Sequence, residues 1–402
     1  MRIAYIVPYQ GPTLLQRRPI IRNRSMSNSI KIEMIAAALR GSSHDVDIIS
    51  QGEVVESSCS FYPSFSDPVR FHPKIPIYYA SVLAVRRLNG IWSNARTLHL
   101  FKKRHRDRPY DLVIIFNMKG PQVACANYSI QHLGLPVLLE YEDDSFSSVH
   151  GEPLNTYVAR SHAVAAQRLL RAVSGCMAVS PYLLSQLPAE IPRLLLRGVV
   201  GQDVIEASRS SQRRNIVLFS GTHVPANGVA ELIEAWRSVC LSNWELHITG
   251  YGQMTESLKQ MAREVTGVVF HGLIDRAELI RLLCTAKICI NPFVKTPAPG
   301  SVFAFKIVEY LAAGAHVIST PMGPLEKELE AGMSYMPDNS AATIAATLKE
   351  VIESRRYELR AMDATQQSYG PKAITVSLDQ LVRTVVKRSS KDPVQLSNLA
   401  YS

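Results

Sequence analysis

The sequence lacks an apolar run that approaches the ~20 residues needed to cross a bilayer as a helix. Residues 1–7 are apolar but too few for a signal peptide, and Pro8 follows them, so they are predicted to be a strand. The six cysteines are scattered without a CxxC spacing, which argues against zinc and favours buried thiols in a reducing compartment. We therefore expect a soluble cytoplasmic protein.

Acidic residues are scarce in the first half of the chain. Residues 1–200 contain 23 Lys and Arg against 14 Asp and Glu, whereas residues 201–402 contain 21 against 20. No DNA- or RNA-binding motif accompanies this surplus, so no nucleic acid partner is expected. An anionic membrane surface explains the surplus better, and would place the protein peripherally on the inner face of the plasma membrane.

The basic residues are densest in residues 77–108, which are predicted to be a long helical stretch with a break near Gly90. The basic residues there include Arg86, Arg87 and the cluster at residues 102–106, and apolar side chains lie between them. This composition suits a helix that lies in the membrane interface. A solvated helix face packed on its own domain has the same composition, and the sequence leaves both interpretations open.

Apolar strands alternate with helix-like segments along most of the chain, as in doubly wound α/β domains. We predict a first domain over residues 1–205, a second over residues 206–372, and a closing helix and tail over residues 373–402. Residues 201–214 are polar and poor in apolar side chains, so they are predicted to be a linker. The fold class is therefore α/β with two Rossmann-like domains.

Acidic residues follow the apolar strand predicted at residues 136–140, at the edge of the sheet where ligands of α/β folds bind. Glu142 and Asp143 are therefore candidates for ligand binding or acid–base chemistry. His150 lies close by in the sequence and is a further candidate acid or base. A solvated turn is the alternative interpretation.

Residues 300–314 are the stretch around which the second half is organised. Gly300 and Ser301 are predicted to open a helix that runs to the end of this stretch, with Lys306 and Glu309 together outside its apolar face. Free N–H groups at the start of such a helix suit a phosphate, and a carboxylate further along suits sugar hydroxyls. These features outline a nucleotide-sugar site, and an amphipathic surface helix with an incidental Lys–Glu pair is the alternative.

Residues 306–314, read as Lys-x-x-Glu-Tyr-Leu-Ala-Ala-Gly and followed by a strand and Gly323, resemble the donor-site signature of retaining GT-B glycosyltransferases of family four, the group 1 glycosyltransferases. The strand–glycine–helix repeat from residue 215 onwards also resembles that family's carboxyl-terminal domain. The resemblance implies two Rossmann-like doubly wound domains facing across a cleft, with the last helix crossing back to the first domain. It implies transfer of a sugar from a nucleotide-diphosphate sugar to a lipid-linked or polysaccharide acceptor, with retention of anomeric configuration and without metal or other cofactor.

Two features of the donor site depart from the family pattern. Glu309 matches the second of the family's two glutamates, which binds the donor's ribose, but Ser301 stands at the first. The family places an Arg and a Lys in the first glycine loop, where this chain has Thr222 and Asn227. The predicted donor-binding residues are Gly221, Thr222, Asn227, Gly250, Gly272, Leu273, Lys295, Gly300, Ser301, Lys306 and Glu309.

The acceptor side is predicted to lie in the first domain. The resembled family often has a His–Asp pair there; Asp143 matches the Asp, and Glu142 stands where the His would be. Gln10 and Gly11, in the loop after the first strand, are also assigned to the acceptor side. The departures from the family pattern keep two other functions open, namely a non-catalytic nucleotide-sugar or partner-binding relative and a nucleotide-sugar 2-epimerase of the same fold.

Overall fold

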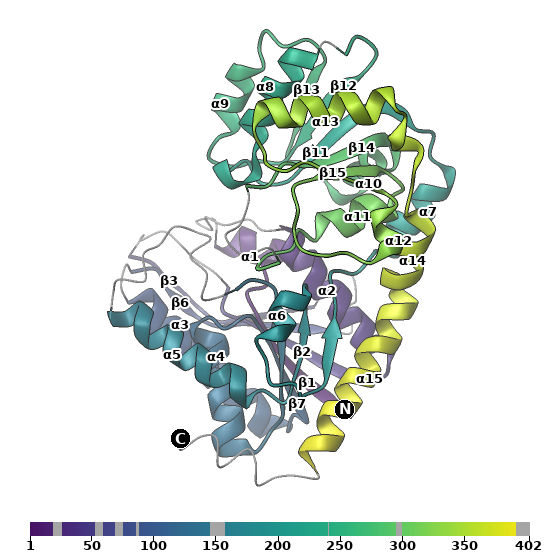
Figure 1. Ribbon diagram of the computed structural model, residues 1–402. Coiled ribbons are helices and arrows are strands. Elements are labelled where there is room, and N and C mark those ends of the chain that lie inside the picture. The colour runs from purple at the N-terminus through teal and green to yellow at the C-terminus, as the bar shows by residue number, and fades with distance from the viewer. Residues whose placement is uncertain are drawn as a thin grey trace. The chain divides into compact units, whose positions relative to one another are not determined.

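The computed structural model (Figure 1) describes residues 1–18, 26–52, 59–68, 75–85, 88–144, 157–239, 241–294 and 300–390. The chain divides into two compact units. Met1–Arg197 and Ile374–Ser402 form the first unit, and Gly198–Ala373 form the second. Each unit contains its own largely parallel sheet, which confirms the α/β class and the two Rossmann-like domains.

The main sheet of the first unit has eight strands in the order β10-β9-β8-β7-β1-β2-β5-β4. All neighbouring strands are parallel except β4, which pairs antiparallel with β5. Its strands are β1 (Arg2–Val7), β2 (Asp45–Ser50), β4 (Phe65–Pro68), β5 (Pro76–Tyr79), β7 (Leu112–Phe116), β8 (Val137–Tyr141), β9 (Gly175–Ala178) and β10 (Arg193–Leu195), and β3 (Phe61–Tyr62) pairs separately with β6 (Val82–Leu83).

The helices of the first unit connect these strands. They are α1 (Pro12–Arg17), α2 (Met26–Gly41), α3 (Asn89–Asp107), α4 (Gly120–Tyr128), the π-helix η1 (Ser129–Leu133), α5 (Tyr157–Ala172) and α6 (Pro181–Ser185). The long last helix, α15 (Pro371–Ser389), packs on this unit from Ile374 onwards. Its Asp379 lies 2.8 Å from the Nε2 of His44, which follows α2. No helix in the described part of the chain is long and apolar enough to cross a membrane.

The sheet of the second unit has six parallel strands in the order β13-β12-β11-β14-β15-β16. Its strands are β11 (Arg214–Ser220), β12 (Glu245–Thr249), β13 (Val268–Gly272), β14 (Ala286–Asn291), β15 (His316–Ser319) and β16 (Met333–Tyr335). Its helical segments are α7 (Gln202–Ser210), η2 (Pro225–Asn227), α8 (Val229–Val239), α9 (Thr255–Met261), α10 (Arg276–Thr285), α11 (Lys306–Ala312), α12 (Lys327–Glu330), α13 (Ala341–Glu353), η3 (Arg356–Glu358) and α14 (Met362–Tyr369).

Side-chain alternation along the strands divides the core of the second unit into two layers. Val217 and Phe219 of β11 face the same buried cluster as Leu232 of α8 and Leu348 of α13. Cys289 of β14 points to the opposite face of the sheet, where it is buried near Arg213 on the side of α10 and α11. Both faces of this sheet are therefore covered, as its nearly continuous apolar strands require.

Three sequence-based expectations about local structure are wrong. Residues 77–83 are not helical, because β5 alternates between buried and partly exposed side chains and pairs with β2. The predicted linker instead contains helix α7, which buries Val204 and Ile205 and packs on α10 and α11. The helix predicted to start near Ser301 begins only at Lys306.

Candidate active site

Three glycines lie together at one edge of the second unit's sheet. Gly221 and Gly250 follow β11 and β12, and Gly272 ends β13, so adjacent parallel strands deliver all three to the same edge. The N–H of Gly250 donates to the carbonyl of Gly272 at 2.8 Å, and the N–H of Gly221 donates to Thr249 at 3.2 Å. These N–H groups therefore bind the loops to one another and are not available to a ligand.

Close backbone contact explains why position 250 is a glycine. Gly250 has φ of 122°, and a Cβ there would lie 1.9 Å from the carbonyl oxygen of Gly221. Gly272 also has positive φ, 68°, but a Cβ there would meet nothing within 4 Å. The next residue, Leu273, is exposed.

Lys306 stands beside the first glycine loop. Tyr310, one turn further along α11, exchanges hydrogen bonds of 3.0 and 3.1 Å with the backbone of Ser220, which fixes the helix next to Gly221. A Cβ at position 221 would lie 3.3 Å from the Nζ of Lys306. The ammonium lies 4.6 Å from the centroid of the Phe219 ring, and no ion pair to it is found within the described ranges. Burial lowers the pKa of the Lys306 ammonium to about 7.

The segment before α11 does not form the helix start that was predicted to hold a phosphate. Ser301 caps nothing, since the residue before the helix is Phe305 and no side chain caps it. Ser301 is instead fully buried, and its Oγ has no hydrogen-bond partner among the described residues. Gly300 adopts φ of 88°. Packing explains the late start, because Phe305 closes against Gly198 within the same unit.

Glu309 is buried and paired with Arg276. The Nη1 of Arg276 donates to the Oε1 of Glu309 at 2.6 Å, and the same guanidinium contacts Asp203 of α7 at 3.2 Å. Burial alone would lower the pKa of Arg276, but Glu309 and Asp203 outweigh it and raise this pKa. The sequence pointed to Glu309 but gave no signal for its partner.

The remaining donor-site predictions fall on the first glycine loop or outside the described residues. The side-chain amide of Asn227 donates to the carbonyl of Thr222 at 2.6 Å, so this side chain closes its own loop. Thr222 is exposed. Lys295 lies outside the described residues, as does His150 of the first unit.

In the first unit, Asn117 holds the acidic segment after β8. Its Oδ1 accepts from the backbone N–H groups of Glu142 and Asp143 at 2.7 and 3.2 Å, and its amide donates to the Asp143 carboxylate at 3.3 Å. Asn117 itself has φ of 53°, a left-handed conformation that asparagine tolerates. The Asp143 side chain is partly exposed, so it is fixed but accessible.

The Glu142 carboxylate belongs to a buried network. It forms an ion pair with Lys31 of α2, whose Nζ also lies 3.9 Å from the Oε1 of Glu140. The hydroxyl of Tyr5 donates to the other oxygen of Glu140. Burial, with the like charge of Glu142, raises the pKa of Glu140, and burial likewise raises the pKa of Glu142 against the opposing effect of Lys31. Asn117 and Lys31 were not foreseen, because both contacts join distant segments.

The loop after β1 packs inward. Gly11 is buried, and a Cβ there would lie 2.8 Å from the hydroxyl of Tyr79 and 2.9 Å from the ring of Tyr9. Gln10 is partly exposed, and its backbone exchanges hydrogen bonds with the Ser29 hydroxyl. Of the two predicted acceptor-side residues, only Gln10 therefore has a side chain and some exposure.

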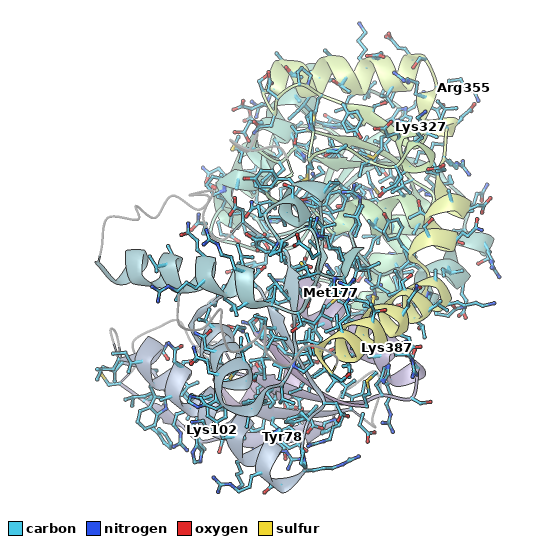
Figure 2. All side chains as sticks on the ribbon, turned by 60° about the horizontal axis from the view of Figure 1, so that its bottom comes forward. Tyr78, Lys102, Met177, Lys327, Arg355 and Lys387 are labelled. Atoms are coloured by element: carbon cyan, nitrogen blue, oxygen red, sulfur yellow. The ribbon has the colours of Figure 1, made fainter. Side chains whose placement is uncertain are left out.

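One side of helix α3 is exposed along its length. Leu88 and Ile91, at its start, are 50% and 71% exposed, and His99, Lys103 and Arg106 continue the exposed stripe towards its end. We call these five residues the α3 surface. Figure 2 labels Lys102 on the same helix, whose Nζ lies 3.9 Å from the centroid of the Tyr128 ring of α4. Arg86 and Arg87 lie outside the described residues.

Comparisons with known proteins agree with this architecture. A family model described as "Glycosyl transferases group 1" matches residues 214–354. A search of curated proteins by sequence finds no match. Among the described residues, no group of three or more His, Cys, Asp or Glu side chains is placed to hold a metal ion.

Solved structures of GT-B proteins match nearly the whole chain. Sucrose-phosphate synthase from Thermosynechococcus elongatus is similar with a TM-score of 0.71 and 16% identity, over 96% of this chain and 99% of that one. Anabaena HepE in complex with UDP is similar with a TM-score of 0.65 and 14% identity, over 96% of this chain and 100% of that one. A candidate UDP-N-acetylglucosamine 2-epimerase from Listeria monocytogenes is similar with a TM-score of 0.59 and 10% identity, over 97% of each chain. The chain has the GT-B fold, and residues 214–354 match the model of the group 1 glycosyltransferases, so the resemblance stated from the sequence is confirmed.

Proposed function

We propose that the protein transfers a sugar from a nucleoside diphosphate sugar, bound by the second unit, to an acceptor bound by the first. The observation that carries this proposal is the partly buried ammonium of Lys306, which lies beside the Gly221 loop with no acidic partner in the described part of the chain. A cation withdrawn in part from water, without a counter-ion, favours an anionic ligand. Structural neighbours bound to UDP and UDP-glucose make a uridine nucleotide the first to test.

The leaving diphosphate gains negative charge as the bond to the sugar breaks. Because the N–H groups of Gly221 and Gly250 are already paired, Lys306 supplies the main fixed positive charge for it. A preorganised cation aimed at developing charge lowers the barrier without reorganisation. We therefore propose that transfer needs no metal and no other cofactor. Retention of anomeric configuration is proposed from the resemblance to the group 1 glycosyltransferases alone.

For the acceptor we propose a lipid-linked or glycan molecule at an anionic membrane surface. Asp143, held by Asn117, would orient the acceptor hydroxyl or help remove its proton. The α3 surface supports a membrane location, since it combines exposed apolar side chains with Lys103 and Arg106. Such a surface suits the boundary between anionic headgroups and acyl chains.

The candidate epimerase among the structural neighbours supports a second function, the 2-epimerisation of a nucleotide sugar. The two reactions differ in their products. A transferase releases a nucleoside diphosphate and needs an acceptor, whereas an epimerase converts the nucleotide sugar with no acceptor and releases no nucleotide. A non-catalytic relative would bind the nucleotide sugar and do neither.

The test begins with a thermal-shift screen of UDP-, GDP- and ADP-sugars. A ligand present at 100 times its dissociation constant adds about 2.7 kcal/mol to the unfolding free energy. The nucleotide sugar that stabilises the protein is then incubated with the protein and a membrane extract, with and without EDTA. The nucleoside diphosphate released is measured. We expect acceptor-dependent release that EDTA does not abolish, and nuclear magnetic resonance of the product would report its anomeric configuration. Conversion of the nucleotide sugar without release of a nucleotide would contradict the transferase function and support the epimerase function.

A further inference from the structure

Glu309 is held on one side by a guanidinium that is itself held by a second carboxylate. Arg276 opens helix α10, Glu309 lies on α11, and Asp203 lies in the first turn of α7, all within the second unit. The side chains of Arg276 and Glu309 are 16% and 9% exposed, whereas that of Asp203 is 47% exposed. The Arg276–Glu309 contact is therefore the less exposed of the two ion pairs that Arg276 forms.

We infer that Arg276 is a positioning residue that fixes the Glu309 carboxylate for the ribose of the donor, an inference that rests on the proposed function. An ionised carboxylate offers about four acceptor sites over its two oxygens. Arg276 occupies one of them, on Oε1, at 2.6 Å. The Oε2 atom has no partner among the described residues, so enough acceptor sites remain for two ribose hydroxyls.

Arg276 does not compete with the ribose for Glu309, for a geometric reason. Its guanidinium is bound through Nη1 to Glu309 and through Nε and Nη2 to Asp203, at 3.2 and 3.5 Å. A planar guanidinium bridging two acids in this way cannot rotate without breaking both contacts. Glu309 is thus kept in one orientation and its charge is balanced, which reduces what must be ordered when a nucleotide binds.

The inference is tested by removing the hydroxyl from the ligand and the guanidinium from the protein. The probe is whichever of UDP, GDP and ADP binds the full chain most tightly, together with its 2′-deoxy form, measured by calorimetry. The deoxy form should bind wild-type protein about tenfold less tightly, as expected for the loss of a hydrogen bond to a charged group. In Arg276→Ala this ratio should fall to within about threefold, because a carboxylate that is no longer oriented discriminates poorly.

Two further variants serve as controls. Arg281→Ala removes an exposed arginine from the same helix, where it pairs with Glu278 at 3.5 Å, and should leave the tenfold ratio unchanged. Arg276→Lys keeps the charge but not the planar fork, and its ratio should fall between those of wild type and Arg276→Ala. If Arg276→Ala gives no cooperative thermal unfolding, Arg276→Lys decides: an unchanged tenfold ratio overturns the inference.

The outcomes separate the inference from the proposed function. A tenfold ratio that survives in Arg276→Ala, even where both ligands bind more weakly, shows that Arg276 acts only on the fold, and the inference fails while the donor site stands. A wild-type ratio near one, with tight binding of both ligands, removes Glu309 from the ribose and overturns the inference. Failure of all three nucleotides to bind overturns the proposed function itself.

Discussion

The ammonium of Lys306 lies 4.6 Å from the centroid of the Phe219 ring, beside the loop that begins at Gly221. The aromatic face attracts the cation but supplies no counter-charge. Burial therefore dominates and brings the pKa of Lys306 down to about 7 from its ordinary value of 10.5.

The first prediction follows from this lowered pKa. A nucleoside diphosphate binds the ammonium form, so UDP affinity should fall by up to about tenfold per pH unit above pH 7. Lys306→Arg, which stays charged, should flatten the pH profile of UDP affinity between pH 7 and 9 in calorimetry.

The same lowered pKa affects stability in the absence of ligand. Between pH 7 and 10 the unfolded chain binds more protons at Lys306 than the folded chain, so the unfolding free energy should rise with pH there. Lys306→Met should remove that rise in urea unfolding.

The second prediction concerns the glycines at the ends of β11, β12 and β13, at one edge of the second unit's sheet. Gly250→Ala should destabilise the protein by more than about 2 kcal/mol, because a Cβ there meets the Gly221 carbonyl and φ is 122°. Gly272→Asn is the matched control, since its φ of 68° suits asparagine and its surroundings are open, so a loss below about 1 kcal/mol is expected. Equal midpoints in thermal unfolding would contradict the close packing of the two loops.

The sequence predicted this edge because strand, glycine and helix follow one another at short range. It also placed Lys306 and Glu309 correctly on one helix, three residues apart. It did not predict where that helix begins, since the contact of Phe305 with Gly198 joins residues far apart in the chain. Arg276 went unnoticed for the same reason, because an ion pair between α10 and α11 has no sequence periodicity.

The third prediction concerns Glu140. Its pKa is raised, so the folded chain keeps a proton that the unfolded chain loses above its ordinary value of 4.5. The unfolding free energy should therefore fall as the pH rises from about 5 to 8. Glu140→Gln can still accept from Tyr5 but carries no charge beside Glu142, so it should remove this fall and exceed wild type by about 1 kcal/mol at pH 8. A variant less stable than wild type at that pH would rule out the buried neutral carboxyl.

The fourth prediction separates the two neighbouring acids. Asp143→Asn should lower transfer by about 10²-fold or more with nucleotide affinity unchanged, because a group acting on the acceptor is lost. Glu142→Gln should instead destabilise the protein by about 3 kcal/mol, because it leaves the buried ammonium of Lys31 without its nearest partner. Asp107→Asn, at an exposed position on α3, is the control for both measurements. Normal transfer by Asp143→Asn would remove this residue from the reaction.

The last prediction concerns the α3 surface. Near an anionic membrane each basic residue contributes about 1 kcal/mol, so Lys103→Glu with Arg106→Glu should weaken binding to phosphatidylserine vesicles more than tenfold. Ile91→Ser should weaken binding as well, but with little change in its salt dependence, since Ile91 carries no charge and is 71% exposed. Lys259→Glu with Lys349→Glu changes the net charge equally on the second unit, at side chains 48% and 64% exposed, and controls for a non-specific charge effect. Equal losses from both double variants would mean that net charge alone attracts the protein, and that the α3 surface is an ordinary solvated helix face.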